Sequence, residues 1–241
     1  MSLVKPSLPL FQRGKAQADG LVMCYPLTEG SDLPNDISGN SIPFTSKTSG
    51  ITWTGSPFGH SLNFDGASST QKLVIAAADA GDLNYVSGSG NLGIFFRIRV
   101  NSFSNSPVIM ANGVFNSDGW YWQLSSTGEP IVALCRSGGT SQLGAPSNKW
   151  TAGVWYSIFL QLLPSGAVPR RELYKYNHET GATDLVGGNG AFYPDSSSRN
   201  FDIGNYPTNS FDAEMDLAEF RVYKDRYFDA QYVRRMFAGF A

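Results

Sequence analysis

The chain alternates apolar and polar residues with a period of two along almost its whole length. Successive side chains of a β-strand point to opposite faces, so this alternation predicts strands with one buried face. Clusters of Gly, Asn, Ser and Pro separate the alternating segments and mark turns. The predicted strands span residues 21–27, 60–66, 71–78, 91–100, 106–113, 119–126, 130–136, 154–163, 171–177, 200–205 and 213–223. The pattern therefore predicts an all-β chain.

Only the C-terminal end has a helical pattern. Asp229 is a suitable N-cap residue for a helix that runs to Phe240. The apolar face of this helix would consist of Val233, Met236, Phe237 and Phe240. No internal repeat or linker interrupts the pattern after residue 20. We therefore expect one β domain over residues 20–241 with a short C-terminal helix, preceded by an extended arm over residues 1–19.

The balance of charge excludes some classes of partner. Charged side chains make up 16% of the 241 residues, and the formal net charge is −2. This is not the basic balance that binding to the phosphates of a nucleic acid requires. The sequence also contains no run of about 18 apolar residues, so we expect no membrane-spanning segment.

The first 19 residues predict an extended basic arm. Pro6 and Pro9 interrupt a short apolar patch, so we expect no secretory signal peptide. Each proline also favours extended geometry in the residue before it. The apolar and basic side chains of the arm would bind a partner, and they are Leu3, Lys5, Leu8, Leu10, Phe11, Arg13 and Lys15.

Cys24 and Cys135 are the only cysteines of the chain, and both lie in predicted strands. Without a signal peptide the chain is not expected to pass through an oxidising compartment. We therefore expect two buried thiols rather than a disulfide bond.

Seven short motifs occur in the order found in laminin-G-like domains of the concanavalin A-like superfamily, and the chain resembles that family over residues 20–241. They are DGLVMCYPLTEGSDLPNDISGN, GHSLNFDG, LGIFFRIRV, WTAGVWYSIFLQL, RELYKYNHETG, NFDIGN and MDLAEFRVYKDRYFDAQYVRRMF. No single motif is specific, and the ordered set carries the resemblance. It implies an antiparallel jelly-roll sandwich of two sheets.

Three acids in the predicted closing strand raise the question of catalysis. Glu214, Asp216 and Glu219 form the pattern Glu-x-Asp-x-x-Glu. This resembles the catalytic signature of laminarinase- and lichenase-type glycoside hydrolases, which cut β-glucan with two carboxylates. In those hydrolases the signature lies on a central strand. Strand alternation also places Glu219 on the face opposite to Asp216 unless a bulge intervenes. We expect no enzymatic activity, and a β-glucan hydrolase is an alternative.

The resemblance also raises a structural calcium ion, because many relatives hold one beside the closing strand. Carboxylate oxygens are the ligands that calcium prefers. The residues at the corresponding positions are Asp65 and Asp216, although the usual closing-strand position is Ala218 here. Apart from this calcium we expect no cofactor.

A cluster around the predicted strand 119–126 suggests a sugar site. Aromatic faces pack against sugar rings, and polar side chains bond their hydroxyl groups. The predicted glycan-binding residues are Asn116, Asp118, Trp120, Trp122 and Tyr206. The alternative is that Trp120 and Trp122 share the face of Leu124 and belong to the core.

Stand-alone domains of this family without a signal peptide look like bacteriophage virion proteins. We therefore expect a non-enzymatic capsid decoration or cement protein, or a tail component, made in the host cytoplasm and located in the virion. It would form a symmetric homo-oligomer and attach to capsid or tail proteins through residues 1–19. The alternatives are a lectin or adhesin for a host surface polysaccharide and the glycoside hydrolase.

Overall fold

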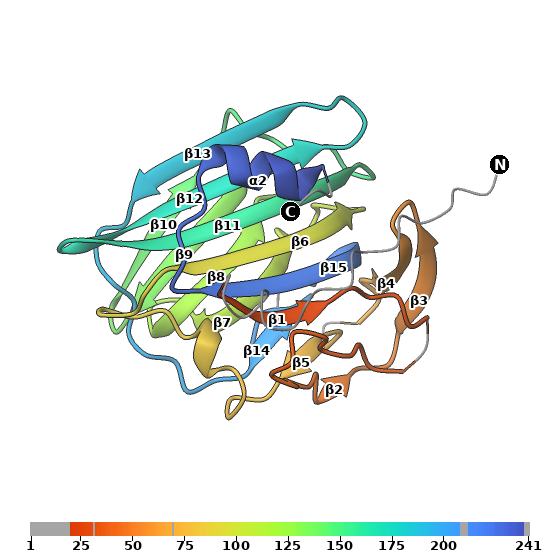
Figure 1. Ribbon diagram of the computed structural model, residues 1–241, viewed down its shortest axis with the longest axis horizontal. Coiled ribbons are helices and arrows are strands. Elements are labelled where there is room, and N and C mark those ends of the chain that lie inside the picture. Colours follow the sequence, from red (N-terminus) through yellow and green to blue (C-terminus); the bar gives the residue numbers. More distant parts are fainter. Residues whose placement is uncertain (1–19, 31, 69, 208–211, 239–241) are drawn as a thin grey trace.

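The computed structural model describes residues 20–30, 32–68, 70–207 and 212–238 (Figure 1). The predicted arm and all its partner-binding residues lie outside these ranges. The described chain forms two antiparallel β-sheets packed face to face. The predicted jelly-roll sandwich is therefore confirmed. No helix in this part of the chain is long and apolar enough to cross a membrane.

Sheet A has eight strands, all paired antiparallel. Its order is β13 (Thr183–Asn189), β12 (Val168–Asn177), β11 (Trp155–Ser165), β6 (Leu92–Val100), β15 (Glu214–Lys224), β4 (Gly59–Asp65) and β3 (Ile51–Ser56). The eighth strand, β1 (Leu21–Tyr25), pairs with β15.

Sheet B has seven strands, again all antiparallel. Its order is β10 (Gly139–Gly144), β9 (Pro130–Arg136), β8 (Asp118–Leu124), β7 (Val108–Val114), β14 (Phe201–Ile203), β5 (Leu73–Ile75) and β2 (Ser46–Lys47). A short 3-10 helix, η1 (Gly81–Leu83), follows β5 along the chain.

Large aromatic side chains fill the space between the sheets. Trp122 on β8 packs against Phe96 of β6 and against Trp150, with ring centroids 5.2 and 5.3 Å apart. Strand alternation sends every second residue of each strand into this layer. The core therefore confirms the period-two reading of the sequence.

Four strands were not predicted: β2, β3, β10 and β13. All four lie at the ends of the two strand orders. An edge strand has a neighbouring strand on one side only and is more exposed to solvent, so it needs fewer apolar residues than a central strand. Its Gly, Thr and Asn residues then look like those of a turn.

The segment from Asp36 to Asn40 is bonded to the first strand, in part through the side chain of Asp36. Its carboxylate accepts hydrogen bonds from the backbone N–H groups of Cys24, Ser38 and Ile42 at 2.9, 2.9 and 3.0 Å. Two more bonds, from Ser38 Oγ and Asn40 Nδ2, reach the carbonyl of Val22. This motif therefore has a structural role, because it ties the loop to β1.

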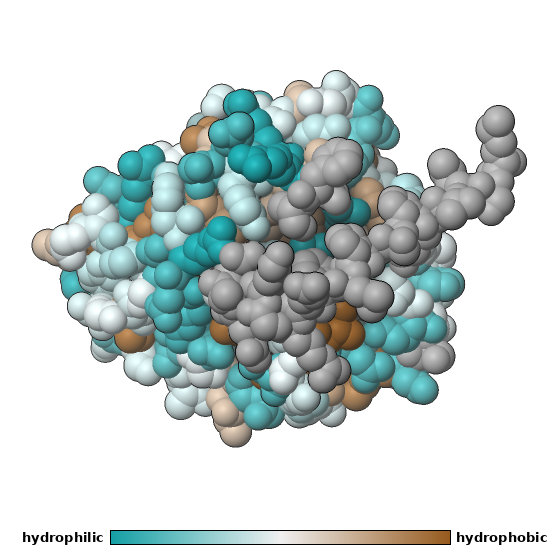
Figure 2. Space-filling view, in the orientation of Figure 1, coloured by the Kyte–Doolittle hydropathy of each residue, from teal (hydrophilic) through white to brown (hydrophobic). Residues whose placement is uncertain are grey.

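The C-terminal helix α2 (Ala230–Phe237) lies across the outer face of sheet A (Figure 1). The Asp229 carboxylate accepts a hydrogen bond from Tyr232 N at 2.7 Å, which confirms the predicted N-cap. Val233, Met236 and Phe237 are buried against that face. The described surface on this side of the molecule is mainly hydrophilic (Figure 2).

Cys24 and Cys135 are both buried and unbonded to each other, as predicted. Burial raises the pKa of the Cys24 thiol to about 12 and that of Cys135 to about 11. Both thiols are therefore protonated at neutral pH and have little reactivity.

Candidate functional site

The predicted sugar site is wrong in its two central residues. Trp120 and Trp122 are both 0% exposed in the core between the sheets. Trp120 Nε1 donates a hydrogen bond to the carbonyl of Leu83 at 2.7 Å, deep inside the molecule. Strand parity explains the error, because alternation identifies two faces of β8 but does not say which one is buried.

Tyr206 is also a packing residue. It is buried on the outer face of sheet B, where its ring meets Tyr121 edge-on at 5.5 Å. Its hydroxyl group accepts a hydrogen bond from the backbone N–H of Phe115. Tyr206 therefore holds the turn between β7 and β8 in place and does not offer its face to a ligand.

The exposed aromatic ring of this region is Phe115, which the sequence analysis missed. Its side chain lies at the β7–β8 turn and is 50% exposed. The next residue, Asn116, has a positive φ of 53° and exchanges hydrogen bonds with Thr140, each of 2.9 Å. An aromatic residue beside the asparagine of a tight turn is the signal that would have identified it.

Asp118 fixes an arginine beside this turn. Arg199 Nε donates to both carboxylate oxygens of Asp118, at 3.0 and 3.1 Å. The Arg199 side chain is 41% exposed. Its terminal amino groups have no partner among the described residues, which leaves four N–H donors on an oriented guanidinium.

A cavity of about 300 Å³ opens next to Arg199. It is lined by Lys72, Ser198, Arg199, Asn200, Asp202 and Pro207. Arg199 lines the cavity and is bonded to Asp118, the first residue of β8 after the Phe115 turn. We call the cavity and this turn together the sheet B site.

Asp202 is the unusual residue of the sheet B site. It is 2% exposed, and Lys72 Nζ lies 3.1 Å from its Oδ2. Its Oδ1 has no hydrogen-bond partner in the part of the chain that the structure describes. Burial raises the pKa of this carboxyl, and the charge of Lys72 opposes the rise. A buried acceptor without a donor is costly, so Asp202 is suited to accept a hydrogen bond from a ligand.

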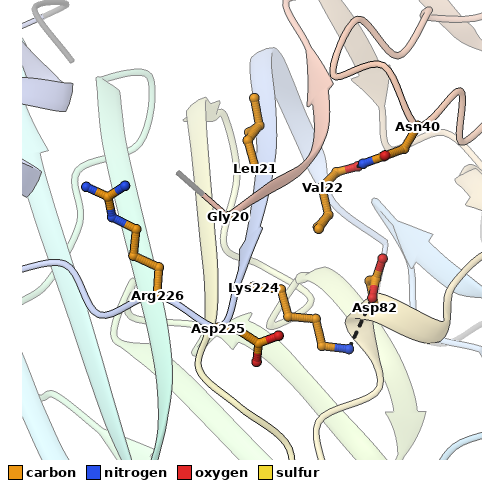
Figure 3. A pocket seen from close by; sticks show the side chains of 8 residues that line it. All are labelled: Gly20, Leu21, Val22, Asn40, Asp82, Lys224, Asp225 and Arg226. Atoms are coloured by element: carbon orange, nitrogen blue, oxygen red, sulfur yellow. Dashed lines mark hydrogen bonds and ion pairs between the residues drawn. The ribbon is translucent and has the colours of Figure 1, made fainter. Parts of the chain in front are cut away.

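A larger pocket of about 590 Å³ lies where β1 begins and β15 ends (Figure 3). Lys224 Nζ and Asp82 Oδ1 form an ion pair of 3.1 Å across it. None of its described lining residues has a buried polar atom without a partner, whereas the cavity beside Arg199 has Asp202 Oδ1. The larger pocket is therefore a weaker candidate than the sheet B site.

The three acids of β15 are placed by a β-bulge. The pairing of β15 with β6 shifts register between Leu217 and Glu219. Leu217 and Phe220 both point into the core, so Asp216 and Glu219 share the outer face of sheet A. The prediction that Glu219 faces away from Asp216 is wrong, because one extra residue in the bulge reverses the alternation.

Both carboxylates on this face are engaged by cations. Arg99 Nε and Nη2 donate to Asp216 Oδ2 at 2.9 and 2.8 Å, and Asn63 Nδ2 donates to Oδ1 at 3.0 Å. Glu219 lies between Arg97, at 3.2 Å, and Arg221. These are the contacts of structural ion pairs, and the absence of catalysis stays a prediction.

The two predicted calcium ligands have separate partners. Asp65 lies opposite Glu214 in the β4–β15 pairing and accepts hydrogen bonds from Ala67 N and Gln71 Nε2. Asp216 is paired with Arg99. Among the described residues, no group of three His, Cys, Asp or Glu side chains is placed to hold a metal ion. These two carboxylates do not fit a shared calcium site, and calcium binding stays a prediction.

His178 is partly buried at the end of sheet A. Its Nε2 lies 2.8 Å from Ser157 Oγ, and its ring meets those of Phe58 and Tyr176 at 4.8 and 4.9 Å. Burial and the charge of Arg97 lower its pKa to about 4. The imidazole is therefore neutral at physiological pH.

This histidine should make the fold sensitive to acid. In the unfolded chain His178 titrates near its ordinary pKa of about 6.5. Between about pH 6.5 and 4 the unfolded state therefore binds more protons than the folded state, and the free energy of unfolding decreases as the pH is lowered. Because the ring is partly exposed, we expect His178→Gln to remove about 1–2 kcal/mol of this loss. Urea unfolding at pH 7 and pH 4 measures it, with the exposed His60→Gln as control. Equal acid sensitivity in wild type and His178→Gln would contradict the assignment.

Comparisons with known proteins support the fold. No protein-family model and no curated protein matches the sequence. The binding domain of Paraclostridial Mosquitocidal Protein 1 is similar in structure, with a TM-score of 0.66 and 15% identity over 91% of this chain and 52% of that one. A structure of botulinum neurotoxin type C, whose cell entry depends on interaction with two ganglioside molecules, has a TM-score of 0.60 and 15% identity over 92% of this chain and 52% of that one. The PL-14 alginate lyase of Aplysia kurodai has a TM-score of 0.57 and 9% identity over 85% of this chain and 99% of that one.

These likenesses show a shared β-sandwich fold. The chain spans about half the length of the two toxin structures. The likenesses support the predicted jelly-roll sandwich as a fold. The bacteriophage type stays a prediction.

Proposed function

We propose that this chain is a carbohydrate-binding β-sandwich whose ligand lies in the sheet B site. The observation that carries the proposal is Asp202, which lines an open cavity and whose buried Oδ1 has no donor among the described residues. Sugar hydroxyl groups are donors of the right kind for such an oxygen. Their ring carbons pack on aromatic faces such as that of Phe115.

The side chains of the site are held before a ligand arrives. Asp118 orients Arg199, Asp202 positions Lys72, and Asn200 Oδ1 accepts a hydrogen bond from Ala77 N at 3.0 Å. Groups that are already ordered lose little conformational freedom on binding. The site therefore combines fixed polar groups with one exposed ring, as sugar sites require.

The similar structures agree with this proposal. One belongs to a toxin that interacts with gangliosides, and another is an enzyme that acts on alginate. The virion role that the sequence suggested depends on residues 1–19, which lie outside the described residues, and it stays an untested prediction.

A glycan array followed by titration of the best ligand tests the proposal. We expect wild type to bind at least one glycan, and Arg199→Ala and Phe115→Ala each to weaken binding about 10-fold or more, which is about 1.4 kcal/mol. Each variant removes one ordered contact and leaves the core intact.

Two exposed residues on the sheet A side of the molecule, in α2 and in the loop before it, provide matched controls. Tyr227 is 55% exposed, and Arg234 lies on α2. Tyr227→Ala and Arg234→Ala should leave affinity unchanged. The proposal fails if wild type binds no glycan, or if these controls weaken binding as much as the site variants do.

A further inference from the structure

The sheet B site has a chemical bias that narrows the class of its ligand. Of its charged lining residues, Lys72 and Arg199 are cationic and Asp202 is anionic. The remaining polar groups, Ser198 and Asn200, are neutral. The lining therefore carries a net charge of +1 in a chain whose formal net charge is −2.

Hydrogen-bond donors outnumber acceptors in this cavity. The terminal amino groups of Arg199 have no partner in the described part of the chain. Among the described residues Lys72 Nζ bonds to Asp202, which uses one of its three N–H donors. Asn200 uses its oxygen on Ala77, which leaves the Nδ2 donors of its amide for a ligand.

From this arrangement we infer that the sheet B site recognises a carboxylate-bearing sugar, such as a uronic acid residue of a polysaccharide. Arg199 and Lys72 bind the carboxylate, and Asp202 Oδ1 accepts from a neighbouring hydroxyl group. This inference rests on the proposed function and adds the ligand class. A planar guanidinium matches a carboxylate with two parallel hydrogen bonds, which is why carboxylate is preferred over a neutral group.

The neighbouring acids do not cancel this bias. Asp118 is bonded to Arg199 through Nε alone, so the outer edge of the guanidinium is left for the ligand. Asp202 is the single anionic lining residue and is buried beneath the cavity surface. A ligand carboxylate therefore meets cationic donors first, while its hydroxyl groups reach the buried oxygen.

The test compares polygalacturonate with its carboxyl-reduced form, which is the same polymer without the acid. We expect wild type to bind the acid form about 10-fold more tightly at low salt, and this preference to shrink at 0.5 M NaCl, where charge is screened. Arg199→Gln and Lys72→Gln should each reduce the preference towards equal binding. Polyglucuronate and its reduced form extend the test to a second uronate.

Asp202→Asn provides a different signature. The substitution keeps an oxygen acceptor, but a neutral amide oxygen accepts a weaker hydrogen bond than a carboxylate oxygen does. We therefore expect weaker binding of the reduced polymer. Because a negative charge is also removed, the preference for the acid form should be kept or increased. Urea unfolding of each variant identifies any that no longer fold. If Asp202→Asn is one of them, Arg199→Gln and Lys72→Gln decide the carboxylate assignment.

The outcomes separate the two proposals. If wild type binds glycans but binds acid and reduced polymers equally, the carboxylate assignment is wrong and carbohydrate binding stands. Preference for a sulfated glycan over every uronate also overturns the assignment. If no glycan of any kind is bound, both proposals fail.

Discussion

Replacing Arg171 with alanine is expected to lower the free energy of unfolding by about 3–5 kcal/mol, because the change leaves a cavity and several carbonyls without donors. Arg171 is 1% exposed on β12. Its Nη1 donates to the carbonyls of Val132 and Ser141 at 2.9 and 2.7 Å, and its Nη2 donates to that of Asn189 at 3.1 Å. One side chain of sheet A therefore ties two strands of sheet B to it.

The charge on this arginine is retained in the folded state. Burial lowers its pKa to about 10, so the guanidinium is protonated at neutral pH. A charged donor makes stronger hydrogen bonds than a neutral one. For this reason we expect Arg171→Met, which keeps most of the volume, to recover only part of the lost stability.

The adjacent arginine is the matched control. Arg170 has a side chain that is 52% exposed and pairs with Glu172 at 2.8 Å. The Glu172 end of this pair is buried, but Tyr174 OH also donates to Glu172 at 3.0 Å and water reaches the exposed Arg170. We therefore expect Arg170→Ala to cost clearly less stability than Arg171→Ala. Urea unfolding followed by tryptophan fluorescence measures both variants. Equal midpoints for Arg170→Ala and Arg171→Ala would show that the buried bonds do not hold the sheets together.

The second large effect concerns Glu219. We expect Glu219→Gln to cost about 2–4 kcal/mol of stability, because it leaves the neighbouring guanidinium groups of Arg97 and Arg221 without the anion between them. The side chains of Glu219 and Arg221 are each 8% exposed, so water screens the remaining repulsion poorly. Gln has nearly the same shape as Glu, and the loss therefore reports on charge.

Glu214→Gln is the control, since it is the same substitution on the same strand. Glu214 is partly exposed and forms no ion pair with the described residues. Its replacement should leave the unfolding midpoint within experimental error. If Glu214→Gln and Glu219→Gln prove equally stable, the acids of β15 are not the structural ion pairs described above.

The acids of β15 show how a sequence motif can be read too literally. The spacing of Glu214, Asp216 and Glu219 resembles a catalytic signature, and the alternation rule argued against it by placing Glu219 on the other face. The bulge after Leu217 reverses that geometry. The structural interpretation survives for a different reason, which is that arginines from β6 and β15 engage Asp216 and Glu219.

The sheet B site was only partly predictable. Asn116 and Asp118 lie where the sequence analysis expected a polar cluster, and Asp118 does orient a residue of the site. Lys72, Arg199 and Asp202 carried no local signal. Lys72 and Asp202 are 130 residues apart in sequence and meet only because β14 pairs with β5.

By itself the sequence determined the class of fold, the buried free thiols and the capped C-terminal helix, because each depends on a local pattern. Alternation specifies a strand, apolar surroundings bury a thiol, and Asp229 caps the helix that follows it. Tertiary structure alone decided which face of β8 is buried, where β15 bulges, and which distant side chains surround Asp202. Those outcomes depend on strand pairing and sheet packing, which join residues that no local pattern relates.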